Sequence, residues 1–182
     1  LGSVLFQKAA PHWETVGLYL SHSAPTVKSV KSVRLDLTSE KDVSALFQEF
    51  RPDVIIHTAA ETRVDVCQAN PDSCRAKNIN ATQILSQLAR KYHSRMIAIS
   101  TDLVFDGTKG NYSESDPTHP LSLYAQTKAI AEELVLNTCS NAVVARIAIM
   151  YGKSPLQRYS FSEWMRKSWE KGQPTPLFYD QF

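Results

Sequence analysis

The stretch Ile99–Gly107, ISTDLVFDG, decides the fold prediction. Apolar residues up to Ile99 predict a buried strand, which stops abruptly at Ser100, Thr101 and Asp102. Three small side chains that carry oxygen therefore follow the carboxyl end of a strand. In an open parallel sheet, ligands bind outside the carboxyl ends of the strands. The stretch thus predicts a parallel sheet with a site at this edge.

Short apolar runs alternate with longer helical patterns on both sides of this stretch. The predicted strands cover residues 16–20, 53–57, 95–100 and 142–147. The predicted helices cover residues 40–50, 70–92, 121–137 and 161–171. Strands that are joined by helical crossovers run parallel to one another. The pattern predicts an α/β fold with a doubly wound parallel sheet.

Composition excludes several classes of protein. The chain has 182 residues, of which 43% are hydrophobic and 21% charged, and its net charge is +2. These values are typical of a folded domain and give no field that would favour a nucleic acid polymer or a membrane surface. There is no apolar run of about 18 residues, and the first residues lack the pattern of a signal peptide. We therefore expect a cytoplasmic protein.

The cysteines support the same compartment. Cys67, Cys74 and Cys139 are odd in number and show no C-x-x-C spacing. Such a set favours reduced thiols over disulfides and predicts no metal site.

Tyr124 and Lys128 form a Tyr-x-x-x-Lys pair within a predicted helix. Residues four apart share one face of a helix, so the phenol and the ammonium project together. A cation beside a phenol favours the phenolate, and we expect it to lower the pKa of Tyr124 from about 10. The Thr101 hydroxyl would hold a carbonyl against that phenol. The three residues predict ketone reduction, although the pair alone also fits a surface helix.

Longer segments strengthen this interpretation. The segment 99–135, ISTDLVFDGTKGNYSESDPTHPLSLYAQTKAIAEELV, resembles the signature of the extended short-chain dehydrogenases/reductases and, among them, of the dTDP-4-dehydrorhamnose reductases. RPDVIIHTAAETRVDVCQANPD at 51–72, RIAIMYG at 146–152 and LFYDQF at 177–182 resemble further parts of that family. The resemblance implies a Rossmann dinucleotide-binding domain over residues 1–152 and the start of a substrate-binding region over 153–182. It also implies an earlier strand and glycine-rich turn and a longer substrate region, so we expect the chain to be part of a longer protein.

The resemblance also implies a role for each matching residue. Thr101, Tyr124 and Lys128 match the catalytic set, and Thr62, Val64 and Thr101 match positions near the sugar substrate. The expected cofactor contacts are Gly2, Ser21, His22, Ser23, Asp36, Leu37, Thr58, Ala59, Ala60, Asn80, Ser100, Tyr124 and Lys128.

Three of these side chains have competing interpretations. Asp36 would accept hydrogen bonds from an adenine amino group, but it also fits a residue that starts a helix. Asn80 matches a helix asparagine that ties a strand to the active-site backbone, although an ordinary helical asparagine remains open. His57 ends an apolar strand, which favours a buried, hydrogen-bonded side chain over a ligand.

The turn after the predicted strand 16–20 bears on the choice of cofactor. An NAD site usually has an acidic residue here, which binds the ribose 2′-hydroxyl. No acid occurs between Tyr19 and Ala24, where Ser21, His22 and Ser23 supply donors. We therefore expect NADP(H) to be preferred over NAD(H).

Two functions follow from the resemblance. The first is reduction of the 4-keto group of a nucleotide-linked 6-deoxy sugar. The second is a regulatory subunit that binds a dinucleotide without catalysis, resembling the methionine adenosyltransferase regulatory subunit, which RIAIMYG matches at least as well. A nucleotide sugar is the partner expected for the first function and a regulatory partner protein for the second. A homodimer is a further expectation for the chain.

Overall fold

The computed structural model describes residues 1–21, 30–152 and 160–175. The chain divides into two compact units. The smaller unit comprises Leu1–Gly17, Ala24–Ser32 and Ile149–Phe182, and the larger one comprises Leu18–Ser23 and Val33–Ala148. The predicted boundary between 152 and 153 remains a prediction.

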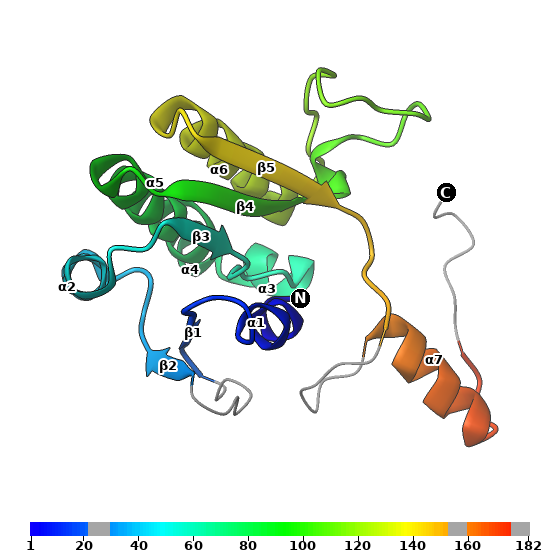
Figure 1. Ribbon diagram of the computed structural model, residues 1–182. Helices are drawn as coiled ribbons and strands as arrows, with labels where there is room; N and C mark the ends of the chain where they lie inside the picture. The colour runs from blue at the N-terminus through cyan, green and yellow to red at the C-terminus, as the bar shows by residue number, and fades with distance from the viewer. Residues whose placement is uncertain (22–29, 153–159, 176–182) are drawn as a thin grey trace. The chain divides into compact units, whose positions relative to one another are not determined.

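A three-stranded parallel sheet forms the centre of the larger unit (Figure 1). Its strands are β3 (Val54–His57), β4 (Arg95–Thr101) and β5 (Ala142–Ile147), in that order across the sheet. His57 pairs with Ala98 and Thr101 pairs with Ile147, so β4 and β5 run beyond the end of β3. Branched apolar residues in the three runs explain the strands. The prediction of a parallel α/β fold is confirmed.

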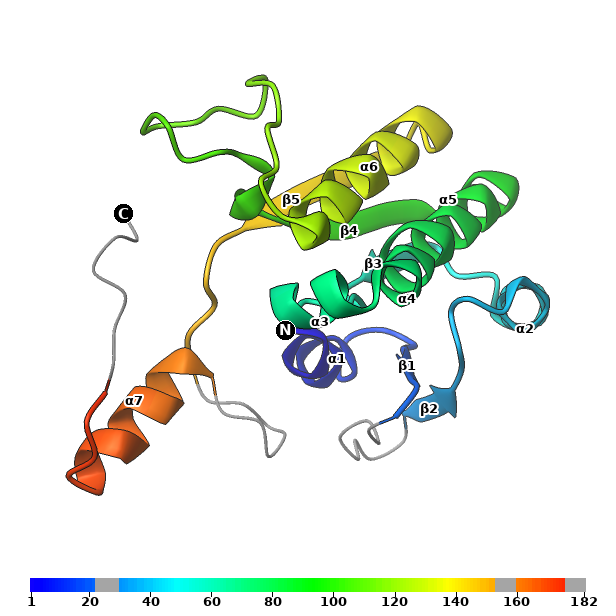
Figure 2. The same cartoon turned by 180° about the vertical axis from the view of Figure 1, so that it is seen from behind.

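Helices α5 (Ala81–Tyr92) and α6 (Leu123–Thr138) cover one face of this sheet, as Figures 1 and 2 show from opposite sides. Helix α2 (Glu40–Phe50) packs beside α5. The core between helices and sheet consists of Val43, Phe47, Leu85, Leu88, Ala89, Met96, Ala98, Val135 and Cys139. Met96, Ala98 and Ser100 alternate along β4 and are all buried, which follows from the two-residue period of a strand.

The predicted helix over 70–92 is interrupted in the structure. It consists of α4 (Pro71–Arg75), a π-helical turn η1 (Ala76–Asn80) and α5. A separate helix α3 (Val64–Ala69), which the sequence analysis did not predict, precedes α4. The chain leaves helical geometry at Asn70 (φ −134°, ψ 70°), and Pro71 starts the next helix because it needs no amide hydrogen there.

This interruption corrects the prediction for the cysteines. Cys67 and Cys74 form a disulfide, with their Cα atoms 5.1 Å apart, and only Cys139 is a free thiol. In a continuous helix, residues seven apart lie about 10.5 Å from each other, beyond disulfide reach. The change of direction at Asn70 brings the two short helices together. Because two of the three cysteines are paired, the cysteines no longer support the expected cytosolic location. That location stays a prediction.

Helices α1 (Gly2–Ala9) and α7 (Phe161–Glu170) belong to the smaller unit. Phe6 of α1 is buried, and its ring would lie 2.7 Å from a Cβ atom added at Gly17, so this contact requires glycine. A capping box between Ser160 and Glu163 starts α7. Strands β1 (Val16–Tyr19) and β2 (Lys31–Arg34) form a two-stranded sheet. In the described ranges, no helix combines the length and apolarity that crossing a bilayer requires.

Candidate functional site

The strand end and the helix that follows it bring the three predicted catalytic residues into one region. Thr101 is the last residue of β4, and it caps the 3-10 turn η2 (Asp102–Val104) by accepting a hydrogen bond from Leu103 N at 3.2 Å. Ser122 caps α6 in the same way, through Ala125 N at 3.2 Å. Tyr124 therefore lies in the first turn of α6, near enough to Thr101 for that side chain to affect the pKa of its phenol. The Thr101 hydroxyl itself donates a hydrogen bond to Asp102 Oδ1 at 3.1 Å.

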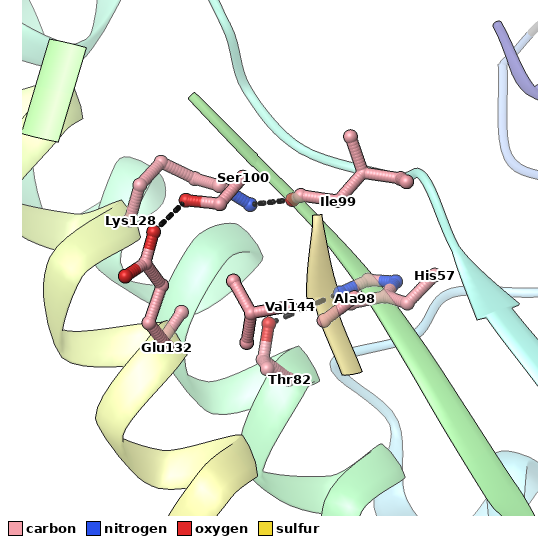
Figure 3. Close-up of a pocket in the computed structure, with 9 residues that line it drawn as sticks. His57, Thr82, Ala98, Ile99, Ser100, Lys128, Glu132 and Val144 are labelled. Atoms are coloured by element: carbon pink, nitrogen blue, oxygen red, sulfur yellow. Dashed lines mark hydrogen bonds between the residues drawn. The ribbon is translucent and has the colours of Figure 1, made fainter. Parts of the chain in front are cut away.

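Lys128 follows Tyr124 by one helical turn and reaches the same strand. Its side chain is only 6% exposed, and its Nζ donates a hydrogen bond to Ile99 O at 2.7 Å (Figure 3). Burial lowers the pKa of Lys128, and the negative charge of Glu132 opposes this shift. An ammonium group has three donors, so this bond leaves others for a ligand.

The expected effect of Lys128 on Tyr124 is wrong. Burial raises the pKa of Tyr124, the neighbouring Thr101 hydroxyl lowers it by less, and the charge of Asp102 raises it further. The ammonium of Lys128 is directed to the backbone of β4 and has no part in this shift. Tyr124 is therefore a protonated phenol at neutral pH. Such a group is a proton donor, which a ketone reduction requires.

The asparagine that ties the loop after β3 to the helices is Asn78 and not Asn80. Asn78 is buried, accepts a hydrogen bond from Glu61 N at 2.8 Å and donates to Glu61 O at 3.0 Å. It also donates to Thr127 Oγ1 of α6 at 3.0 Å. Asn80 is exposed. The π-helical turn explains the error, because it changes which residues face inward compared with a regular helix.

His57 is a buried histidine with a partner, as expected. Its Nε2 lies 3.0 Å from Thr82 Oγ1, and the Thr82 hydroxyl donates to Asn78 O at 2.7 Å. Since the hydroxyl hydrogen is used in that bond, Nε2 of His57 carries the hydrogen of its own bond. Burial, with a smaller contribution from Lys128, lowers the pKa of His57 to about 4. The imidazole is therefore neutral at pH 7.

The remaining predicted positions of the larger unit lie in loops, apart from Val64, which starts α3. Thr58 and Ala60 are partly buried and Ala59 is exposed in the loop after β3, while Thr62 and Val64 are exposed farther along. Asp36 accepts hydrogen bonds from N and Oγ1 of Thr38, at 2.9 and 2.8 Å. These bonds lower the pKa of Asp36. They also match its alternative interpretation, a residue that prepares the start of a helix.

Five other predicted positions have separate outcomes. Leu37 packs against the core of the larger unit, and Gly2 is the first residue of α1 in the smaller unit. Ser21 is exposed and has an interaction partner. His22 and Ser23 lie outside the described residues. Their contacts with a cofactor remain predictions. Among the described residues, no cluster of three or more acidic, histidine or cysteine side chains could hold a metal ion.

Glu132, four residues after Lys128 on α6, forms an ion pair that the sequence pattern did not predict. Its carboxylate pairs with Arg146 of β5, and Arg146 Nη2 lies 2.7 Å from Glu132 Oε2. The Ser100 hydroxyl donates to Oε1 of Glu132, so its hydrogen is engaged within the protein and does not face a cofactor. The sequence shows only that Glu132 shares a helix face with Lys128, four residues earlier. It does not show the pairing with Arg146, because Arg146 lies on another element.

Comparisons with known proteins agree with this geometry. Residues 8–182 match the family RmlD substrate binding domain. Methionine adenosyltransferase 2 subunit beta from Xenopus laevis is 38% identical over 77% of this chain and 40% of its own length. A dTDP-4-dehydrorhamnose reductase from Aggregatibacter actinomycetemcomitans is 36% identical over 65% of this chain and 41% of its own length.

Solved structures give the same result. The dTDP-4-dehydrorhamnose reductase from Bacillus anthracis, determined in complex with NADP, has a TM-score of 0.73 and 26% identity over 79% of this chain and 51% of that one. The chain spans about two fifths of the length of the curated relatives named above. It belongs to the RmlD-like family of extended short-chain dehydrogenases/reductases.

Proposed function

We propose that the protein is a reductase that uses a nicotinamide dinucleotide to reduce the 4-keto group of a nucleotide-linked 6-deoxy sugar. The observation that carries this proposal is the meeting of Thr101, Tyr124 and Lys128 where β4 ends and α6 begins. The dTDP-4-dehydrorhamnose reductases among its relatives support the substrate class.

The described residues fit the nicotinamide half of such a cofactor. Lys128 has a charged donor whose first bond, to Ile99 O, orients it along the strand end. The loop after β3 has only small side chains at Thr58, Ala59 and Ala60, which allow close approach of a planar ring. When bound, a reduced nicotinamide supplies the hydride for ketone reduction.

The chain's own residues would supply the proton and the orientation. The Thr101 hydroxyl, which donates to Asp102 Oδ1 in the structure, would turn to hold the carbonyl oxygen. Tyr124 would give its proton to the same oxygen as negative charge develops there. The raised pKa of Tyr124 keeps that proton in place until the transfer. Lys128 would hold the cofactor ribose through the ammonium donors that its bond to Ile99 O leaves unused.

Consumption of NADPH by the intact protein with dTDP-4-keto-6-deoxy sugars tests the proposal. We expect Tyr124→Phe to lower kcat/KM by about 10²- to 10⁴-fold, the usual contribution of general acid catalysis, while NADPH still binds. Turnover by Tyr124→Phe at the wild-type rate would remove Tyr124 from the mechanism. Titration with NADPH and NADH tests the preference for NADP(H), which rests on the absence of an acid between Tyr19 and Ala24.

A regulatory subunit is the second candidate, because the methionine adenosyltransferase 2 beta subunit from Xenopus laevis is 38% identical. If wild type and Tyr124→Phe bind NADPH equally and neither turns over a ketone, this candidate is favoured. The next measurement would then be co-elution of the intact protein with a methionine adenosyltransferase catalytic subunit in size-exclusion chromatography. A reductase without this partner would elute alone.

A further inference from the structure

The strongest unexplained feature of the larger unit is the buried carboxylate of Glu132. Its side chain is 6% exposed, and a charge at such a position is costly unless partners compensate it. Arg146 supplies part of the compensation through Nε, at 3.2 and 3.1 Å from the two carboxylate oxygens, and through Nη2. The Ser100 hydroxyl supplies another donor.

Glu132 and Lys128 hold consecutive residues of the same strand. Lys128 binds Ile99 O and, one helical turn later, Glu132 binds the hydroxyl of Ser100. Figure 3 shows both side chains reaching from α6 toward the end of β4, where they line one small cavity. Thr101 is the next residue along the strand, so these two bonds tie α6 to the two residues that directly precede it.

Arg146 is in turn fixed by the strand register and by a ring. It pairs with Ser100 across the β4–β5 ladder, so the two side chains meet Glu132 on the same face. Its guanidinium also lies 4.9 Å from the centre of the Phe105 ring. That ring stacks on Tyr112 at 4.2 Å. The strand register and the Phe105 ring therefore fix the position of the Arg146 guanidinium, which in turn fixes the Glu132 carboxylate.

We propose that Glu132 is a positioning residue of this site, which holds the end of β4 through Ser100 and supplies the countercharge of Lys128. The inference rests on the proposed reductase site, in which Lys128 must be an ammonium.

The ionisable groups around Lys128 come from three elements. Glu132 of its own helix and His57 of β3 line the same cavity as Lys128, Arg146 of β5 pairs with Glu132, and Tyr124 lies one helical turn before Lys128. His57 and Tyr124 are both neutral at pH 7 because burial shifts their pKa values away from it. The charge that opposes the loss of the proton from Lys128 is therefore that of Glu132.

Carbon-13 NMR of lysine-labelled intact protein would test the countercharge, with the Lys128 signal assigned by its loss in Lys128→Arg. We expect Glu132→Gln to lower the titration midpoint of Lys128 by about one pH unit. Arg146→Gln removes a competing cation and is expected to raise it. Glu133→Gln is the matched control, because it makes the same change at the next residue, which is exposed.

Hydrogen exchange of the Thr101 amide would test the hold on β4. We expect exchange to become about tenfold faster in Ser100→Ala, as for the loss of one hydrogen bond to a charged group, with no change in the titration of Lys128. An unchanged Lys128 midpoint in Glu132→Gln, or equal shifts in Glu132→Gln and Glu133→Gln, would overturn the proposal. If Glu132→Gln does not fold, absence of a rise in Arg146→Gln overturns it. Neither readout needs a ketone or a cofactor, so failure of the reductase assay is a separate result.

Discussion

His57 allows the sharpest prediction about stability. The imidazole is 5% exposed and donates to Thr82, and burial lowers its pKa to about 4. In the unfolded chain its pKa returns to about 6.5. Between these two values the unfolded state binds more protons than the folded state, so the free energy of unfolding falls as pH falls from about 6.5 toward 4.

The size of this effect follows from the two pKa values. Each unit of difference corresponds to about 1.4 kcal/mol, and most of the interval is crossed between pH 7 and pH 4.5. His57 should therefore account for a loss of about 2 kcal/mol in the free energy of unfolding over that range. Other groups also titrate there, so only a difference between variants isolates the contribution of His57.

Urea denaturation of the intact protein at pH 7 and pH 4.5 would measure the contribution of His57 to the free energy of unfolding. His57→Gln keeps an N–H donor within reach of Thr82 but cannot gain a charge, so its loss of stability on acidification should be smaller by about 2 kcal/mol. Exposed His93, replaced by Asn to suit its positive φ of 58°, is the control and should behave like wild type. The same pH dependence in wild type and His57→Gln would refute the argument from burial.

Two further predictions concern the region beside Tyr124. Asn78→Ala should lower the free energy of unfolding by about 1–3 kcal/mol, because it removes the partner of both backbone groups of residue 61, whereas Asn80→Ala should have little effect in the same urea titrations. If Asn78→Ala and Asn80→Ala lowered the free energy of unfolding equally, the bonds of Asn78 to the backbone of residue 61 would not stabilise the fold. A maleimide should label only Cys139 in the denatured, unreduced protein and all three cysteines after reduction, as mass spectrometry would show; three labels without reduction would exclude the Cys67–Cys74 disulfide.

Local pattern was sufficient for most of the secondary structure. Helix α2 and strand β5 have the predicted bounds, because amphipathic spacing and branched apolar runs act within one element. The shared helix face of Tyr124 and Lys128 is also a local property, since it depends only on the 3.6-residue turn. The position of Ser100 and Thr101 at the end of β4 is a local property too, because the apolar run stops there.

Tertiary structure decided the features that depend on distant residues. Sequence spacing predicted a lowered pKa for Tyr124, but burial raises it, and the ammonium of Lys128 turns to Ile99 O. The break at Asn70 brings Cys67 and Cys74 together, although a continuous helix would keep them apart.

The sequence by itself determined the parallel α/β class, the main elements and the identity of the catalytic candidates. Only the tertiary structure decided their charge states and supports, including Asn78 in place of Asn80 and the pairing of Glu132 with Arg146. The physical reason is that periodicity fixes which face of an element a residue occupies. Burial and partners come from other elements, and they set the pKa values and the hydrogen bonds.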